Sequence, residues 1–162
     1  MIQLIRTKSD NQDFIDLVYL LDEYLAEKDG KEHSFYAQFN TIDALRQVVV
    51  AYLDKEPVAC GALKEIDKDR MEIKRMFTKK AQRGKGIASQ VLEELEKWAQ
   101  ELNYPTCVLE TGKRQLEAVQ FYLKNEYQVT PNYGQYMGIK NSICFQKNLT
   151  SKPFNTNSFS EK

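Results

Sequence analysis

Several features of exported and membrane-bound proteins are missing from this chain of 162 residues. No apolar run approaches the roughly 20 residues that a membrane-spanning helix needs. The first residues, Met1–Arg6, alternate in polarity as a strand does, and they lack the apolar core of a signal peptide. We therefore expect a cytoplasmic protein without a membrane partner.

An excess of charge of either sign is also missing. Lysine and arginine together number 23, aspartate and glutamate also number 23, and the formal net charge is zero. A nucleic-acid surface or an anionic membrane would find no general electrostatic attraction here. We expect no nucleic-acid partner, and the basic residues between positions 74 and 85 are best suited to one polyanionic ligand.

Metal-binding residue patterns are absent as well. The chain has one histidine, and its three cysteines show no CxxC spacing. Such a set does not predict a metal site. Cys60, Cys107 and Cys144 are far apart, and each lies in an apolar, strand-like run. We expect them to be buried, reduced thiols of a cytosolic protein.

The most informative segment that is present is Phe77–Ala88. It indicates the end of a strand, a short turn and a basic, glycine-spaced start of a long amphipathic helix. Gly84 and Gly86 let a ligand approach the backbone, because neither carries a Cβ atom. The first-turn N–H groups of the helix lack intrahelical partners and carry the positive end of its dipole. With the charges of Arg83 and Lys85, this arrangement suits a pyrophosphate, although a plain turn without a ligand is also compatible with it.

Two common phosphate loops do not match this segment. A P-loop would need a hydroxyl residue for magnesium where Ile87 and Ala88 stand, and a dinucleotide fingerprint would need a third glycine. The spacing Arg83-x-x-Gly86-x-Ala88 instead resembles the acetyl-CoA pyrophosphate loop of the GNAT superfamily of N-acetyltransferases, whose pattern is Gln/Arg-x-x-Gly-x-Gly/Ala.

A second motif downstream strengthens the resemblance. A helix expected over residues 115–125 resembles the superfamily pattern Asn-x-x-Ala-x-x-x-Tyr-x-x-x-Gly-Phe/Tyr, with Ala118, Tyr122 and Tyr127 in register. Gln115 stands where asparagine is usual, which keeps an amide on a longer arm. Glu126 stands where glycine is usual, so this helix must end without the residue that most easily adopts a left-handed conformation.

The periodicity along the chain predicts both strands and helices. Strands are expected over residues 2–7, 48–52, 57–63, 71–78, 106–110, 127–131 and 141–148. A capping box at Ser9–Gln12 predicts the start of a helix that ends near Asp29, and another helix starts at Gly84. A short further helix is expected within residues 31–45.

This order of elements is that of the GNAT fold. The resemblance implies an α/β (α+β) domain over residues 1–150, with a mixed, mostly antiparallel sheet of about seven strands flanked by about four helices. It also implies that the fourth and fifth strands splay apart. Residues 151–162 are expected to form a polar C-terminal tail.

The resemblance implies acetyl-CoA as the co-substrate and no metal. Pantetheine would lie in the gap between the splayed strands, pairing with the main chain of Met76, Phe77 and Thr78 and contacting Gln115. The pyrophosphate would lie on the backbone amides of the glycine loop, assisted by the side chains of Arg83 and Lys85. The loop residues are Gly84, Lys85, Gly86, Ile87, Ala88 and Ser89.

The implied reaction transfers an acetyl group from the thioester to an amine. Tyr122 matches the superfamily tyrosine and would protonate the CoA thiolate, while an N–H of Phe77 or a neighbour would stabilise the thioester oxygen. The general base is open between Glu72, Glu110, His33 and water alone. On a regular fourth strand, Glu72, Lys74 and Met76 would share one face.

The acceptor is the least defined part of the prediction. His33, Tyr36, Tyr133 and Tyr136 lie in two polar, aromatic segments that could line its site. Several glutamates favour a small, cationic amine, and the protein could be a monomer or a homodimer. The alternatives are a non-catalytic acyl-CoA-binding sensor, which would not need Tyr122, and a purely structural domain with a basic turn.

Overall fold

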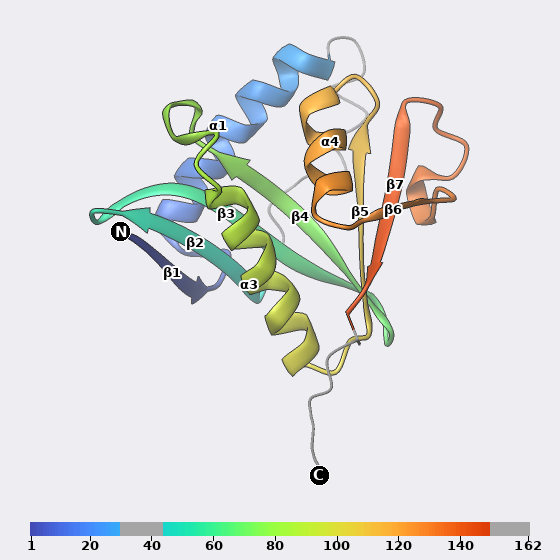
Figure 1. Cartoon of the computed structure of the whole chain (residues 1–162), viewed down its shortest axis with the longest axis horizontal. Coiled ribbons are helices and arrows are strands. Elements are labelled where there is room, and N and C mark those ends of the chain that lie inside the picture. The colour runs from blue at the N-terminus through green and yellow to red at the C-terminus, as the bar shows by residue number, and fades with distance from the viewer. Residues whose placement is uncertain (30–43, 150–162) are drawn as a thin grey trace.

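The computed structural model describes residues 1–29 and 44–149, which form one mixed sheet with helices on both faces (Figure 1). The strands are β1 (Ile2–Thr7), β2 (Gln47–Leu53), β3 (Glu56–Asp67), β4 (Arg70–Thr78), β5 (Thr106–Gly112), β6 (Gln128–Thr130) and β7 (Ser142–Asn148). Their order in the sheet is β1-β2-β3-β4-β5-β7-β6, and all neighbours are antiparallel except β4 and β5. The predicted fold class is therefore confirmed.

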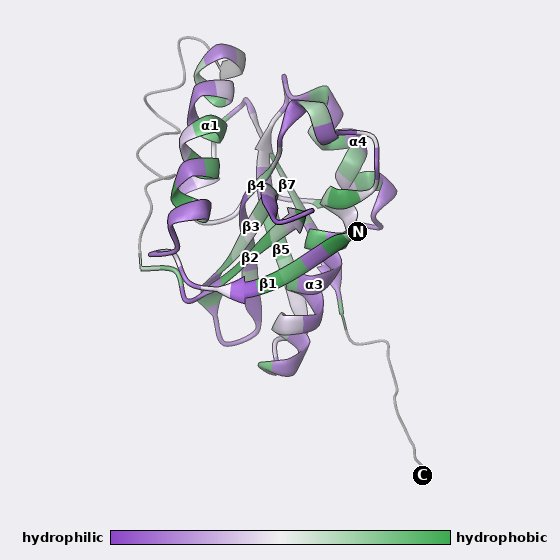
Figure 2. Ribbon diagram, turned by 90° about the vertical axis from the view of Figure 1, so that its left-hand side faces the viewer, coloured by the Kyte–Doolittle hydropathy of each residue, from purple (hydrophilic) through white to green (hydrophobic). Residues whose placement is uncertain are grey.

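Three α-helices occur in the part of the chain that the structure describes. They are α1 (Gln12–Asp29), α3 (Ile87–Glu101) and α4 (Leu116–Lys124). Figure 2 shows α1 on one side of the sheet and α3 on the other. The helix expected within residues 31–45 falls mostly outside the described residues. None of the three helices has the length and apolarity needed to cross a membrane.

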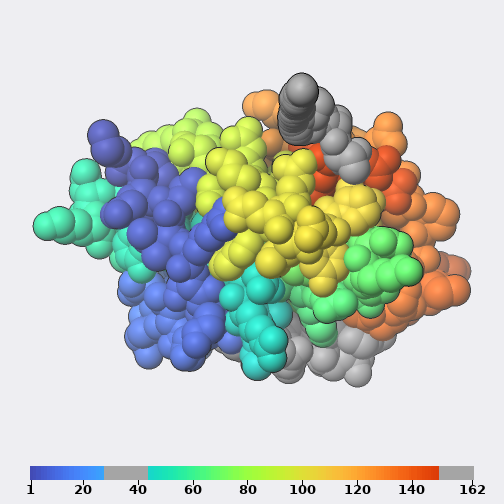
Figure 3. All heavy atoms as spheres, turned by 90° about the horizontal axis from the view of Figure 1, so that it is seen from below, coloured from blue at the N-terminus to red at the C-terminus, as the bar shows by residue number. Residues whose placement is uncertain are grey.

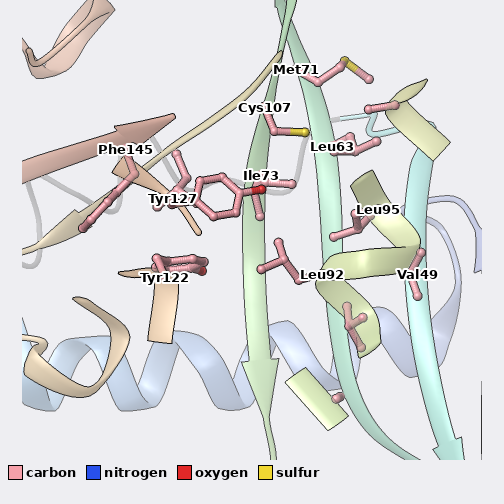
Figure 4. Close-up of a cluster of buried hydrophobic side chains, with 14 of the residues drawn as sticks. Val49, Leu63, Met71, Ile73, Leu92, Leu95, Cys107, Tyr122, Tyr127 and Phe145 are labelled. Atoms are coloured by element: carbon pink, nitrogen blue, oxygen red, sulfur yellow. The ribbon is translucent and has the colours of Figure 1, made fainter. Parts of the chain in front are cut away.

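Each face of the sheet has its own apolar core. Val91, Leu92 and Leu95 of α3 are buried against one face (Figure 4), and Phe14 and Leu17 of α1 are buried against the other. The strands between these two layers are apolar on both faces, as the run 48–51 shows. The three cysteines are buried and reduced, as predicted. Burial raises the pKa of the Cys60 thiol to about 12.

Arg6 attaches β1 to α3. Its guanidinium lies 2.8 Å from Glu94 and 2.7 Å from Glu101, and its Cζ atom is 4.7 Å from the centroid of the Trp98 ring. Figure 3 shows the N-terminal residues packed beside the C-terminal half of α3. Ion pairs thus attach the edge strand β1 to α3, and backbone pairing attaches it to β2.

A β-bulge changes the side-chain alternation predicted for β4. Cys60 pairs with Phe77 and Ala62 pairs with Lys74, so Gly61 faces two residues, Arg75 and Met76. The extra residue moves every later side chain to the opposite face. Met76 therefore packs with the α3 core, and its predicted place on one face with Glu72 and Lys74 was wrong. Gly61 leaves room for this side chain, because a Cβ atom there would lie 2.6 Å from Met76 Sδ and would displace it.

The predicted capping box at the start of α1 was also wrong. The side-chain oxygen of Asn11, and not that of Ser9, accepts the backbone N–H of Phe14 at 3.0 Å. Ser9 instead accepts the N–H of Leu45 through its hydroxyl and donates its own N–H to the Leu45 carbonyl. The Ser9 hydroxyl, which the local pattern assigned to the helix cap, thus makes a long-range hydrogen bond with Leu45 instead.

Glu126 adopts the left-handed conformation that the family pattern assigns to glycine, with φ of +74°. It ends α4 in a Schellman motif. The N–H of Tyr127 donates to the Tyr122 carbonyl at 3.0 Å, and the N–H of Glu126 donates to the Leu123 carbonyl at 3.1 Å. The cap is thus complete, but a residue with a Cβ atom occupies its strained position.

Candidate active site

Strands β4 and β5 separate toward their C-terminal ends. They pair only at Arg70–Thr106, Met71–Cys107 and Glu72–Val108, whereas β4 continues to Thr78 and β5 to Gly112. Figure 1 shows the two strands diverging. Within the described residues, no strand pairs with the β5-facing edge of β4 beyond Glu72. The splayed strands are therefore present as predicted.

A cavity lies between the separated strand ends. Its walls come from β4, β5, the start and body of α4, two leucines of α1, and Tyr136 in the segment before β7. The lining residues are Leu21, Leu25, Glu72, Ile73, Lys74, Arg75, Met76, Glu110, Thr111, Gly112, Gln115, Ala118, Tyr122 and Tyr136. Six residues predicted for the site meet here: Glu72, Met76, Glu110, Gln115, Tyr122 and Tyr136.

Tyr122 enters this cavity from α4. Its side chain is 8% exposed, and its ring lies 5.8 Å from that of Tyr127 and 6.0 Å from that of Phe145 (Figure 4). Burial raises the pKa of the Tyr122 hydroxyl above its ordinary value. The hydroxyl therefore keeps its proton at neutral pH and can donate it to a group in the cavity.

Glu110 borders the cavity at the end of β5. Its Oε2 atom accepts a hydrogen bond of 2.7 Å from the Ser142 hydroxyl on β7. The residue is only partly buried. Its carboxylate is therefore oriented by a neighbouring strand while the residue keeps some exposure to solvent.

Glu72 is more enclosed, with an exposed fraction of 2%. The Tyr133 hydroxyl donates to its Oε2 atom at 2.7 Å, and Lys74 Nζ lies 3.8 Å from its Oε1 atom. Both carboxylate oxygens thus have protein partners. Tyr133 lies behind Glu72 and does not line the cavity, in contrast to Tyr136.

Two cations of the cavity wall were missed by the sequence analysis as site residues. Lys74 is 9% exposed, and burial lowers the pKa of its ammonium group despite the nearby Glu72 carboxylate. Arg75 is 6% exposed and occupies the bulge with φ of +61°. Its Nη1 atom donates to Asp22 on α1 at 3.0 Å. Arg75 reaches this position because of the bulge. The sequence of β4 contains no glycine or proline that would indicate a bulge.

The glycine loop follows β4 directly. A short 3-10 turn, Lys80–Gln82, leads to Gly84 and Gly86, whose φ angles are +81° and +80°. Gly86 is the N-cap of α3, without a side-chain cap. The first backbone hydrogen bond at this end runs from the Gln90 N–H to the Gly86 carbonyl, so the preceding amides have no helical acceptor. Apart from its chain neighbours, no atom of the described residues would lie within 4 Å of a Cβ atom at either glycine. Exposed N–H donors at a helix start suit a phosphate group.

The two basic side chains of the loop are held in place. Arg83 Nε donates to the Thr78 carbonyl at 3.0 Å, and its guanidinium lies 5.0 Å from the Tyr24 ring and 5.9 Å from the Phe77 ring. Lys85 Nζ donates to Gln82 at 2.9 Å. Both residues remain exposed, so their charges stay accessible to an anion at the loop.

The remaining predicted residues occupy different surroundings. Phe77 packs against the α1 core, and neither it nor Thr78 lines the cavity. His33 and Tyr36 lie outside the described residues. Across residues 1–29 and 44–149, histidine, cysteine and acidic side chains form no group of three that could hold a metal ion.

Comparison with protein families identifies this arrangement. The model of the GNAT acetyltransferase family matches residues 14–127, which include β4, the glycine loop and α4. The chain belongs to the GNAT acetyltransferase family. It is also 34% identical over 101 residues to an uncharacterized N-acetyltransferase of Bacillus subtilis, YsnE, a match that covers 61% of this chain and 67% of that protein.

Solved structures share the fold. A PaiA N-acetyltransferase of Thermoplasma acidophilum in complex with coenzyme A superposes with a TM-score of 0.66 and 18% identity, covering 91% of this chain and 99% of that one. A GNAT acetyltransferase of Elizabethkingia anophelis with acetyl-CoA bound gives a TM-score of 0.64 and 18% identity, covering 91% and 97%. At these identities the likeness concerns the fold.

Proposed function

We propose that this protein transfers the acetyl group of acetyl-CoA to the amine of a small molecule. The observation that carries the proposal is the cavity between β4 and β5, where Tyr122 and Glu110 border an unpaired strand edge. The strand that supplies this edge leads directly into the glycine loop. A thioester and its pyrophosphate could thus be held by one continuous segment.

The residues present fit the CoA part of this co-substrate. The amides of Gly84 to Ser89 and the charges of Arg83 and Lys85 would bind the pyrophosphate. Within the described residues, no strand pairs with the β5-facing edge of Met76 to Thr78. Apart from the Thr78 carbonyl, which accepts from Arg83, the main-chain groups of this edge would pair with pantetheine amides, and Gln115 borders the same space. Relatives with CoA or acetyl-CoA bound share this fold, which supports the assignment.

The chemistry needs one base and one acid. The acceptor nitrogen attacks the thioester carbonyl carbon, a C–N bond forms, and the C–S bond breaks. Glu110, directly or through water, takes the proton that the amine must lose. The Tyr122 hydroxyl gives its proton to the departing thiolate, and a β4 backbone N–H stabilises the carbonyl oxygen while it carries charge. The products are an N-acetylated amine and CoA.

The test is acetyl-CoA-dependent thiol release across amino acids, polyamines, aminoglycosides and short peptides. Release with one class, together with mass-spectrometric detection of its acetylated product, would establish transfer to that class. If no amine of the panel causes thiol release although CoA binds clearly, the result would instead favour a non-catalytic acyl-CoA sensor.

CoA binding itself can be measured without knowing the acceptor. A ligand at 100 times its dissociation constant adds roughly 2.7 kcal/mol to the free energy of unfolding. A thermal unfolding curve unchanged at millimolar CoA would contradict both the enzyme and the sensor.

A further inference from the structure

One N–H donor of a charged side chain that lines the cavity lacks a partner among the described residues. Arg75 Nε is fully buried, and it has no hydrogen-bond acceptor within the described residues. The other side of the same guanidinium is satisfied, because Nη1 donates to Asp22. A buried donor on a charged group that stays unpaired is unfavourable, and native proteins seldom keep one without a reason.

The backbone at Arg75 is strained as well. Its φ of +61° is uncommon for a residue with a Cβ atom, and it arises from the bulge opposite Gly61. Strained backbone conformations concentrate at ligand sites, where the surrounding structure holds them. Here the bulge places Arg75, which carries this unpaired Nε, among the residues that line the cavity containing Tyr122 and Glu110.

Among the described residues, the carboxylates near this donor have other partners. Glu72 is occupied by Tyr133 and Lys74, and Asp22 already accepts from Arg75. Glu110 accepts from Ser142. The adjacent Lys74 adds a second buried cation on the same strand. An anionic group brought by the ligand would give Arg75 Nε the acceptor that it lacks.

We propose that the acceptor is an amine that also carries a carboxylate, as a free amino acid does, and that Arg75 Nε binds this carboxylate. The proposal rests on the proposed acetyl transfer. A guanidinium N–H bound to a carboxylate is a strong, charge-assisted hydrogen bond, and it would orient the acceptor amine relative to the thioester. Arg75 is thus assigned to specificity, whereas Tyr122 and Glu110 are assigned to chemistry.

The experiment compares acceptors that differ only in this charge. L-amino acids and their carboxamides are assayed in pairs at saturating acetyl-CoA. We expect the best amino acid to exceed its carboxamide at least tenfold in kcat/KM. Arg75→Met should remove this preference by lowering kcat/KM for the amino acid at least tenfold, while the carboxamide changes less than twofold. Asp22→Asn removes the charge beside Nη1 but keeps an oxygen that can accept from it, so this variant should keep the preference and serves as the matched control.

Three results would overturn the proposal. The first is a wild-type enzyme that uses carboxamides as well as amino acids or better, a result that does not depend on the folding of any variant. The second is an equal loss for both acceptors in Arg75→Met. The third is a raised KM for acetyl-CoA in that variant, which would assign Nε to the co-substrate.

The carboxylate site can be tested even if the protein acetylates none of the acceptors. Absence of thiol release with every acceptor would contradict the proposed acetyl transfer. Isothermal titration of the CoA-saturated protein with N-acetyl-L-amino acids and with their amides would then test the carboxylate site alone. Binding at least tenfold tighter for the acids would support the site, and equal binding would overturn it.

Discussion

The Tyr133 hydroxyl donates a hydrogen bond of 2.7 Å to Glu72 Oε2. Each residue was predicted for a different task, Tyr133 for contact with the acceptor and Glu72 for proton abstraction. Their contact ties up one carboxylate oxygen, and Lys74 lies 3.8 Å from the other. Among the carboxylates of the cavity wall, this arrangement favours Glu110 over Glu72 as the general base.

We predict that Glu110→Gln lowers kcat by about a hundredfold or more, within the range usual for a positioned acid or base. The glutamine keeps an oxygen that can accept from Ser142, so the fold should persist. The measurement is kcat at saturating acetyl-CoA and acceptor, with Glu72→Gln as the comparison. If Glu72→Gln lost more activity than Glu110→Gln while remaining folded, the assignment of the base would be reversed.

Tyr122→Phe should slow turnover while leaving acetyl-CoA affinity intact. The variant keeps the buried ring contacts with Tyr127 and Phe145 and removes only the proton donor. We expect kcat to fall by about a hundredfold, because a positioned acid contributes at least this much. The dissociation constant for acetyl-CoA, measured by titration calorimetry, should change less than twofold. Unchanged kcat with unchanged affinity would remove Tyr122 from the mechanism.

Gly86→Ala should weaken CoA binding beyond its effect on stability. Its φ of +80° makes alanine unfavourable by about 1 kcal/mol. The new Cβ atom would contact no described residue beyond its chain neighbours, so we attribute any further effect to the ligand. Gly138→Ala is the matched control, since its φ is +81° and its Cβ is equally unobstructed. Both variants should lose similar stability, but only Gly86→Ala should raise the CoA dissociation constant, by about tenfold. Equal CoA affinity in the two variants would argue against the loop as the pyrophosphate site.

Much of this arrangement could be predicted from the sequence because it is local. The glycine loop needs only adjacent residues with the right φ angles, and Tyr122 follows from its spacing along one helix. The hairpin between β2 and β3 likewise depends on a short turn. Each of these features is encoded by neighbours in the chain, so a single sequence contains the signal.

The features that escaped prediction depend on distant partners. Whether β4 contains a bulge is decided by Gly61 on β3 and by the space that Met76 fills beside Leu95. Met76 and Phe77 are both apolar, so either register is compatible with the pattern. For the same reason Arg75 could not be placed in the cavity, and Ser9 could not be seen to bind Leu45 instead of capping α1.

Tyr133 should also make stability sensitive to alkaline pH. Burial, and then the nearby Glu72 carboxylate, raise the pKa of its hydroxyl above the ordinary value of 10.0. As the pH rises, the Tyr133 hydroxyl therefore loses its proton in the unfolded chain before it does so in the folded protein. The contribution of Tyr133 to the free energy of unfolding is complete below pH 10 and is lost as the pH rises further. Tyr133→Phe should flatten the decline in the free energy of unfolding above pH 10. At neutral pH it should cost about 1.5–3 kcal/mol, because a buried charge loses a hydrogen bond.

Urea unfolding at several pH values measures both effects of this substitution. Tyr19→Phe is a suitable control, because Tyr19 is 65% exposed. A slope above pH 10 that is the same in Tyr133→Phe and in the wild type would contradict the proposed linkage.

Glu126→Gly should stabilise the protein. Glu126 holds φ of +74° at the end of α4, where glycine has no steric penalty. Relieving this conformation is worth about 1 kcal/mol, partly offset by the greater freedom of glycine in the unfolded chain. The two hydrogen bonds of the Schellman motif use backbone groups, so they persist in the variant. Glu117→Gly, in the first turn of α4, should instead destabilise by about 1 kcal/mol, because it lowers helix propensity and removes an acidic side chain from the helix start. Opposite shifts of the urea midpoint in the two variants would establish that the strain lies at Glu126. Destabilisation by Glu126→Gly would contradict this and show that the glutamate side chain itself stabilises the end of the helix.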